Sequence, residues 1–416
     1  MGKLAVVGGT PVRTAPWPAW PVFGEPEERA LLETLRSGTW GRLDGQRVAE
    51  FERRFAAFQG ARYGVASLNG TVTLRIALLA AGIGAGDEVI VPPYTFFATA
   101  SAVVEANATP VFADIDPDTY NIDPRAIEAA VTPRTRAILP VHLAGLPADM
   151  DDILAVASRH GLTVIEDAAH AHGAAYKGRG AGSIGQMGSF SFQSSKNLTC
   201  GEGGIVLTSD QQLYERCFQI HNCGRPFRRG AWYLHETLGA NLRMSEFHGA
   251  VLLAQLDRLA DQTARRNANG AYLAARLAEV PGVRPQARPE SATRHGYHMF
   301  VLRFDESAWG VPRDAIVDAV AAEGIPICAG YTIPLYRQPM FSDRRFGPYT
   351  GQGASPDYAS FAARCPVCER VAAHEAAWMP QQSLLGTTKD MDDVVEALEK
   401  AYRGRDELRT HGNRNC

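Results

Sequence analysis

Two reactive side chains, a carboxylate and an amine, stand at the ends of apolar runs in the middle of the chain. Asp167 closes the run Thr163–Asp167, and Lys196 follows a second run that contains Ser191 and precedes the glycine-rich turn Gly201–Gly204. Pyridoxal phosphate enzymes need such a set: a lysine for the Schiff base, a carboxylate that keeps the pyridine nitrogen protonated, and small or hydroxyl residues for the phosphate. The pattern therefore predicts this chemistry, with Lys196 and Asp167 as catalytic residues.

The position of each group supports its role. A carboxylate that holds a proton on a pyridine nitrogen must be partly buried, and Asp167 ends the most apolar run, whereas Glu166 faces the opposite side of the same strand. A desolvated lysine has a lowered pKa and becomes a usable amine. Taken alone, Asp167 could cap the next helix and Lys196 could be a solvated loop residue; the serine, the glycines and the strand order favour the catalytic interpretation.

Lysine is scarce in this chain, so each one is informative. Arginine supplies most of the 42 basic residues. The lysines are Lys3, Lys177, Lys196, Lys389 and Lys400.

The surrounding elements alternate between short apolar runs and helical patterns. Several of the runs are continuously apolar, as strands buried on both faces are, and this order predicts an α/β fold with a mainly parallel seven-stranded sheet whose sites lie at the carboxyl ends of strands. The expected strands are 63–68, 88–91, 110–115, 137–143, 163–167, 188–193 and 204–208, and the expected helices among them are 73–81, 97–106, 125–131 and 149–160.

The rest of the chain divides into further regions. A long helical stretch over 245–277 leads out of the sheet, and beyond it 296–304 reads as a strand and 313–323 and 391–403 as helices. We expect an N-terminal arm at 1–30, a large cofactor-binding domain at 31–279, a smaller α+β domain at 280–403 and a polar, mobile tail at 404–416, with a loop at 347–356.

Composition excludes several classes of protein. The 416 residues carry a formal charge of −3, which argues against a nucleic-acid-binding protein and against docking on an acidic membrane. No apolar run is long enough to span a membrane. The seven cysteines are scattered and odd in number, so we expect a reduced, cytoplasmic protein without a disulfide framework.

Two short motifs resemble sites of other kinds. The glycines of 180–185 spell G-x-G-x-x-G but precede a strand, so a dinucleotide site is not expected. Cys365 and Cys368 form a lone C-x-x-C with no second pair nearby, and we expect no metal site.

The block EDAAHAHGAAYKGRGAGSIGQMGSFSFQSSKNLTCGEGGIVLT, residues 166–208, resembles the DegT/StrS family of sugar and aminocyclitol aminotransferases. The resemblance runs from about residue 5 to residue 403 and implies the fold-type I architecture of pyridoxal phosphate enzymes. Family members that act as dehydratases carry histidine in place of the lysine, so Lys196 places this chain with the transaminases. Val72 departs from the small alanine that is more usual there.

The resemblance also implies roles for individual residues. Lys196 matches the Schiff-base lysine and Asp167 the partner of the pyridinium nitrogen, while His170 matches a position near the phenolic oxygen of the cofactor. Phe96 matches the aromatic ring stacked on the pyridine. The matches to phosphate contacts are Gly70, Thr71, Ser191 and Asn241, the last of which reaches the partner subunit in the family and implies a homodimer with shared active sites.

The segments 4–21, 297–310 and 330–341 resemble L-glutamine:scyllo-inosose aminotransferases of aminocyclitol antibiotic pathways. This implies L-glutamine or L-glutamate as donor and a keto-cyclitol as acceptor. Arg243 is our candidate for the donor carboxylate, and the candidates for the acceptor are Tyr331, Tyr336 and His298. A nucleotide-diphosphate keto-sugar aminotransferase and a non-catalytic sensor that binds pyridoxal phosphate remain as alternatives.

Overall fold

One mainly parallel sheet organises the larger part of the protein. The computed structural model describes residues 3–227, 233–349 and 356–412. Within them, seven strands form a sheet in the order β1-β9-β8-β5-β4-β2-β3, and β9 alone runs antiparallel to its neighbours. The seven-stranded sheet expected from the apolar runs is thus confirmed. Its strands are β1 (Tyr63–Ser67), β2 (Glu88–Val91), β3 (Thr109–Phe112), β4 (Thr135–Ile138), β5 (Thr163–Asp167), β8 (Met187–Ser191) and β9 (Gly204–Thr208).

The strand ends depart from the predicted ranges for a local reason. The strand expected over 137–143 ends at Ile138 and continues only as an isolated bridge between Val141 and Asp167, because Pro140 has no N–H to donate to a neighbouring strand. The carbonyl of Pro140 accepts a hydrogen bond from the backbone N–H of Asp167 at 2.8 Å instead, so this turn holds the end of β5 in place.

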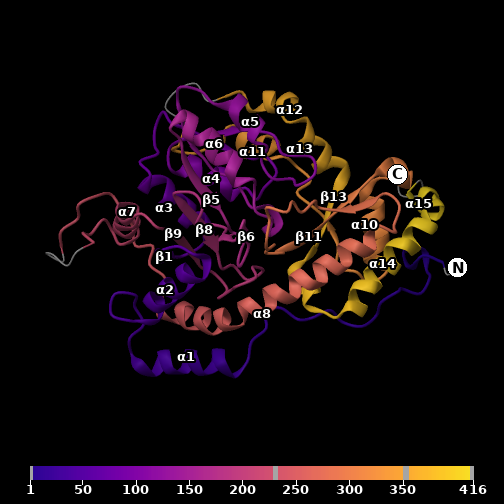
Figure 1. Ribbon diagram of the computed structural model, residues 1–416, viewed down its shortest axis with the longest axis horizontal. Coiled ribbons are helices and arrows are strands. Elements are labelled where there is room, and N and C mark those ends of the chain that lie inside the picture. The colour runs from indigo at the N-terminus through magenta and orange to yellow at the C-terminus, as the bar shows by residue number, and fades with distance from the viewer. Residues whose placement is uncertain (1–2, 228–232, 350–355, 413–416) are drawn as a thin grey trace.

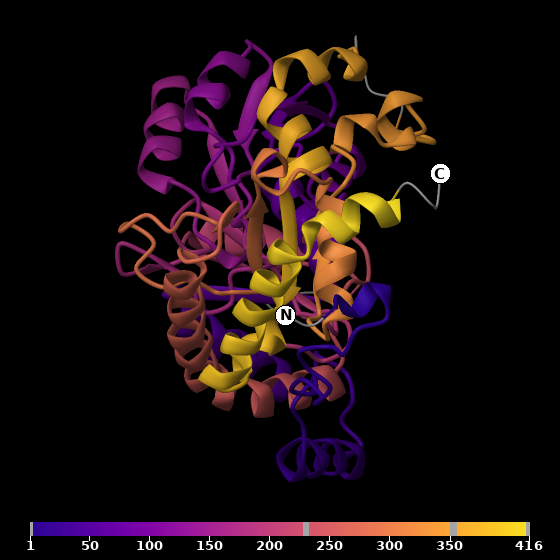
Figure 2. The same cartoon turned by 90° about the vertical axis from the view of Figure 1, so that its right-hand side faces the viewer.

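Helices cover the sheet (Figure 1). α3 packs against α4 and α7, and α5 packs against α6. Two further helices, α1 and α2, lie in a region for which no element is predicted, and both pack along α8; in Figures 1 and 2, α1 is on the side of α8 that faces away from the sheet. The bounds are α1 (Glu25–Ser37), α2 (Arg47–Gln59), α3 (Gly70–Ala80), α4 (Ala98–Glu105), α5 (Pro124–Ala130), α6 (Met150–His160), α7 (Gln211–His221) and α8 (Glu246–Leu277).

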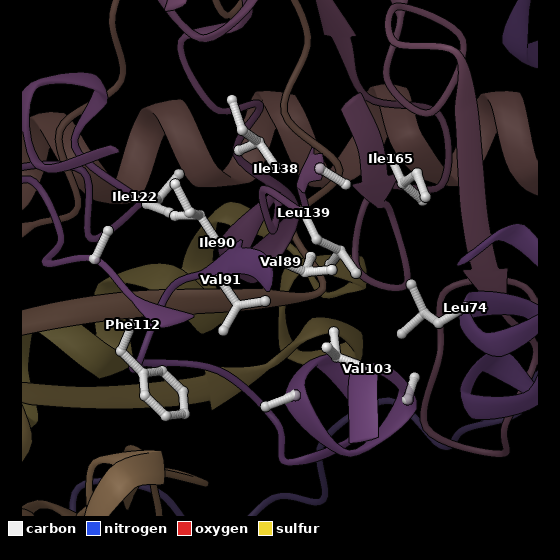
Figure 3. Packing of buried hydrophobic residues seen from close by; sticks show 14 of the residues in the cluster. Leu74, Val89, Ile90, Val91, Val103, Phe112, Ile122, Ile138, Leu139 and Ile165 are labelled. Atoms are coloured by element: carbon white, nitrogen blue, oxygen red, sulfur yellow. The ribbon is translucent and has the colours of Figure 1, made fainter. Parts of the chain in front are cut away.

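The core of the large sheet is a continuous cluster of aliphatic side chains. Figure 3 shows Val103 of α4 pointing toward Val89 of β2, with Leu139 beside it. All three side chains are fully buried. Burying a Val or Leu side chain stabilises a fold by roughly 1.5–3 kcal/mol, so this layer fixes the strands whose ends form the site.

A second sheet follows α8, in the order β10-β11-β13-β12. It has its own core with the helices α10 and α14. We propose a domain boundary near 279/280, because α8 ends at Leu277 and β10 begins at Val283. The elements of this region are β10 (Val283–Pro285), β11 (Met299–Phe304), α9 (Glu306–Trp309), α10 (Arg313–Ala322), β12 (Cys328–Ala329), β13 (Ala376–Pro380) and α14 (Thr388–Arg403). A separate short hairpin in the large domain consists of β6 (Ala175–Tyr176) and β7 (Arg179–Gly180).

One segment of the smaller region packs on the large sheet. It contains α11 (Pro339–Ser342), α12 (Phe361–Arg364) and α13 (Pro366–Arg370). Cys365 and Cys368 are fully buried here, in the same cluster as Phe112 of β3. Burial raises the pKa of both thiols, so the C-x-x-C pair serves as apolar packing.

The N-terminal arm is anchored at several points before α1. The buried carboxylate of Glu323 accepts hydrogen bonds from the backbone N–H groups of Ala5 and Val12 and from Lys400 Nζ at 2.7 Å. Arg13 is held by Asp390 and Asp393. Further on, the indole N–H of Trp20 donates to the carbonyl of Ser194 at 2.9 Å, so the arm connects the small domain with the turn before Lys196.

The C-terminal tail contains more structure than expected. α15 (Arg405–Gly412) follows α14, and Leu408 is buried in the small-domain cluster. Residues 413–416, and 350–355 of the expected loop, lie outside the described residues. No helix in the described part of the chain is long and apolar enough to cross a membrane.

The G-x-G-x-x-G segment encloses a carboxylate. Glu166 is fully buried, and its oxygens accept 2.7 Å hydrogen bonds from the backbone N–H groups of Gly182, Ile184 and Gly185. His142 Nε2 donates a fourth bond at 2.8 Å, because its Nδ1 accepts from the N–H of Ala148. Gly182 and Gly185 therefore have a structural role, because their backbone N–H groups pair with the buried carboxylate of Glu166 in β5.

We expect Glu166→Gln to lower the free energy of unfolding by about 3 kcal/mol, because an amide cannot accept all four bonds and leaves buried N–H groups unpaired. Urea denaturation would measure the loss. Glu128→Gln, at a surface carboxylate that binds Arg159 and His160, serves as control and should leave the midpoint unchanged. Equal midpoints for both variants would contradict the structural role of Glu166.

Candidate active site

A cavity of about 570 Å³ opens where β5 and β8 end. These strands are parallel neighbours, so their carboxyl ends meet at one edge of the sheet. Asp167 is the last residue of β5 and Ser191 the last of β8, while Gly70 begins α3 opposite them. The predicted residues that line this cavity are Gly70, Thr71, Phe96, Asp167, His170, Ser191, Lys196, His298 and Tyr331.

Asp167 is buried and fixed by two hydrogen bonds. Its Oδ2 accepts from Thr99 Oγ1 at 2.8 Å, and its Oδ1 accepts from the N–H of Ala169 at 3.2 Å. Burial raises the pKa of Asp167, while the Thr99 bond and the charge of Lys196 act in the opposite direction. A buried carboxylate with unused lone pairs is suited to accept a proton-bearing nitrogen. Thr99 was not predicted as a site residue. The signal in the sequence that could have indicated it is a hydroxyl side chain within a helix of small residues.

Lys196 follows a tight turn, in which its N–H donates to the carbonyl of Gln193 at 2.9 Å. Burial lowers the pKa of Lys196 to about 8, and the nearby charge of Asp167 limits the decrease. The amine is therefore largely available as a nucleophile at mildly alkaline pH.

We expect Lys196 in the cofactor-free protein to gain reactivity with a midpoint near pH 8, as its pKa of about 8 implies. Asp167→Asn should move this midpoint to lower pH, because the carboxylate favours the ammonium form. Acetylation rates measured by mass spectrometry between about pH 6 and 11 would show both effects. Exposed Lys177, whose pKa is raised by Asp151, is an internal control, and an identical midpoint for the two lysines would contradict the prediction.

The start of α3 forms an anion cradle. Asn69 Oδ1 caps the helix by accepting from the N–H of Val72 at 2.9 Å, and the first N–H groups of a helix have no partner within it. Gly70 and Thr71 present such groups to the cavity, beside Ser191. A Cβ on Gly70 would lie 2.7 Å from the Cβ of Ser191, so only glycine permits this approach. The bulkier Val72 lies on the helix without filling the cradle, and Asn69 is a functional residue that was not predicted.

Two histidines form one wall of the cavity. The rings of His170 and His298 lie 4.3 Å apart at 32°. Burial lowers the pKa of both well below the ordinary value, so both rings are neutral. His170 Nδ1 is buried and has no hydrogen-bond partner among the described residues. Phe96 and Tyr331 close other sides, and 53% of Phe96 is exposed.

Three predicted residues lie elsewhere. Tyr336 is buried in the core, and its hydroxyl donates to Glu369 at 2.8 Å, so it packs the fold and does not line the cavity. Arg243 Nη1 donates to Asn222 Oδ1 at 2.8 Å, and Asn241 is exposed near the same strand edge. Neither Arg243 nor Asn241 lines the cavity of its own chain.

The residues present fit pyridoxal phosphate. The Gly70 cradle suits a phosphate, Asp167 a protonated pyridine nitrogen, and Lys196 an aldehyde carbon. His170 Nδ1 is an unpaired polar atom at the wall, available to a polar group of the cofactor. The bound cofactor would supply an electron sink. Fold and site together define a fold-type I transferase that depends on pyridoxal phosphate.

The chain belongs to the DegT/DnrJ/EryC1/StrS aminotransferase family, whose profile matches residues 22–399. It is a transaminase, and the sensor interpretation is set aside.

Several relatives match over nearly the whole chain. An L-glutamine:2-deoxy-scyllo-inosose aminotransferase of Streptoalloteichus tenebrarius is 42% identical over 98% of this chain and 99% of its own. A putative L-glutamine:3-amino-2,3-dideoxy-scyllo-inosose aminotransferase of Streptomyces kanamyceticus is 40% identical over 98% of both chains.

Solved structures agree with the sequence relatives. The 3-amino-5-hydroxybenzoic acid synthase structure superposes with a TM-score of 0.85 at 37% identity, covering 94% of this chain and 99% of that one. DesI in the presence of its TDP-sugar product gives 0.82 at 34% identity and 98% coverage of both chains.

Proposed function

We propose that this enzyme transfers an amino group from L-glutamine, or L-glutamate, to the ketone of a cyclitol such as scyllo-inosose or 2-deoxy-scyllo-inosose, in aminocyclitol biosynthesis. The observation that carries the proposal is the character of the cavity: among its described lining residues, Lys196 is the one lysine or arginine. The remaining polar groups are hydroxyls, amides, neutral histidines and carboxylates. Such walls suit an uncharged polyol ketone, and the names of the full-length relatives point to the same substrates.

The roles of the chain's own groups follow from their positions. With pyridoxal phosphate bound, the free amine of Lys196 would carry a proton at the reacting carbon, a step typically worth about 10²–10⁴-fold. Asp167 would keep the pyridine nitrogen protonated. The α3 cradle orients the phosphate, and the packed histidines and Tyr331 keep water from one side of the cavity.

We further propose a homodimer that shares its active sites. Asn241 and Arg243 lie outside the cavity of their own chain, and Leu238 nearby is 92% exposed. In Figure 1 the chain around α7 projects from the edge of the large domain. α1 also leaves Leu31, Leu32 and Leu35 exposed, and apolar side chains grouped in this way mark an interface. The donor carboxylate would then be held by Arg243 from the second copy.

The runner-up is an aminotransferase for nucleotide-diphosphate keto-sugars. It is suggested by DesI, whose structure was solved in the presence of its TDP-sugar product. A diphosphate calls for basic side chains, preferably arginine. The arginines of this chain do not converge on the described part of the cavity. We also propose a cytoplasmic location, since six free cysteines in the described residues suit a reducing compartment.

The test is a visible absorption spectrum of the purified protein, followed by turnover. We expect a band from bound cofactor that is converted by L-glutamine and restored by scyllo-inosose, with no band in Lys196→Ala. Restoration by a TDP-linked keto-sugar but by no cyclitol would favour the runner-up. A protein that takes up no pyridoxal phosphate would contradict the proposal.

A further inference from the structure

A second cavity of about 610 Å³ adjoins the cofactor site. We call it the outer cavity; it lies between Trp20–Pro21 of the arm, the turn Ser194–Ser195 and residues 380–382 at the end of β13. It shares Ser195, His298 and Met299 with the cofactor cavity, so the two spaces meet at these residues.

The outer cavity carries no aspartate, glutamate, lysine or arginine among its described lining residues. Its polar groups are serine hydroxyls, glutamine amides, the ring of His298 and the thiol of Cys328, and the indoles of Trp20 and Trp378 form apolar walls. Aromatic walls with a few neutral polar groups are typical of sites for uncharged small molecules. An amino-acid donor, with an ammonium and a carboxylate, would meet no charged side chain in this lining. The buried guanidinium of Arg266 lies behind it, 5.5 Å from the ring of Trp20 and hydrogen-bonded to Gln381.

The ring of His298 stands at the boundary with a fixed orientation. The carbonyl of Gly296 accepts a hydrogen bond from Asn197 Nδ2 at 2.7 Å, so the amide oxygen of Asn197 must face the other way. That oxygen lies 3.3 Å from His298 Nδ1, which therefore carries the proton. The neutral ring then has an unprotonated Nε2 as its remaining acceptor.

From these contacts we propose that the outer cavity holds the ring of a neutral polyol acceptor, and that His298 Nε2 accepts a hydrogen bond from one of its hydroxyls. Asn197, directly after Lys196 and 1% exposed, acts as a positioning residue that sets the tautomer of His298. The inference rests on the proposed function, because it assigns the acceptor of that reaction to a place in the fold.

The test separates the two half-reactions. In His298→Leu we expect kcat/KM for scyllo-inosose to fall roughly tenfold, the loss of one hydrogen bond, while the single-turnover rate with L-glutamine falls by a clearly smaller factor. His298→Gln, which keeps an acceptor, should recover part of the loss. An equal fall in both half-reactions, or an unchanged kcat/KM for the acceptor, would overturn the inference.

A separate measurement tests the positioning role of Asn197. In ¹⁵N-histidine spectra of the cofactor-free protein, the signal lost in His298→Leu should be that of a ring protonated at Nδ1, and Asn197→Ala should alter it. Asn267→Ala is the matched control, because Asn267 binds the backbone of His295 and lies outside both cavities. It should leave both the His298 signal and the acceptor kcat/KM unchanged. A ring protonated at Nε2 in the wild type would overturn the assignment.

Turnover distinguishes the two proposals. If no amino acid converts the bound cofactor, the proposed function fails. If turnover with scyllo-inosose is intact and the His298 variants retain acceptor affinity, only the outer-cavity inference fails.

Discussion

Replacement of Lys196 by alanine is expected to reduce transamination by at least about 10³-fold, because one amine both binds the cofactor covalently and moves the proton. No other lysine among the described residues lines the cavity, so none can substitute. The rate of amino transfer from L-glutamine to scyllo-inosose, measured by chromatography of the product, would show the loss. The thermal midpoint of the cofactor-free protein should not fall, since removing a buried amine relieves desolvation.

Lys177→Ala is the control for this experiment. Lys177 is exposed on the large domain and pairs with Asp151, remote from the cavity lining. Its loss should leave the rate within about twofold. Activity in Lys196→Ala close to that of Lys177→Ala would contradict the assignment of the catalytic amine.

Asp167→Asn is expected to lower the rate by about 10²–10³-fold without unfolding the protein. An opposite charge shifts the pKa of a neighbouring group by about 1–3 units, so its loss removes the proton from most of the bound pyridine. The amide oxygen of the variant can still accept from Thr99, and only the longer bond from the N–H of Ala169 is lost. Single-turnover absorbance with L-glutamine would measure the effect on the donor half-reaction.

Thr99→Val provides the comparison. It removes one hydrogen bond to Asp167 but leaves the carboxylate, so a decrease of at most about tenfold is expected. If Asp167→Asn were no slower than Thr99→Val, the charge of Asp167 would not be what the reaction requires.

Sequence alone predicts those parts of the fold whose physical cause is local. The strand Thr163–Asp167 is buried on both faces, and its continuous apolar run could be read directly. The same reading places Asp167 at a strand end, where parallel topology brings it to Ser191 and Lys196. Helix α3 begins three residues earlier than predicted, because the cap formed by Asn69 tolerates glycine and threonine in the first turn.

The parts that sequence does not predict depend on distant segments. Tyrosine is a residue type that often contacts substrates, but Tyr336 is buried beside Phe112 of β3. The two residues are far apart in the chain, so the sequence does not reveal their contact. Arg243 lies two residues after Asn241 in sequence, yet it does not line the cavity of its own chain. The outer cavity is lined by the arm, the turn before Lys196 and the end of β13. Because these segments are far apart in the chain, no single run of residues predicts the cavity.

The N-terminal arm limits how the two domains can move. Its first part is fastened to α10 and α14 through Glu323 and Arg13, and Trp20 is fastened to the carbonyl two residues before Lys196. A rigid-body rotation of the small domain would therefore pull on the lysine turn, unless the Trp20 hydrogen bond breaks first. The hydrogen bond from Trp20 therefore couples the position of the small domain to the turn that carries the catalytic amine.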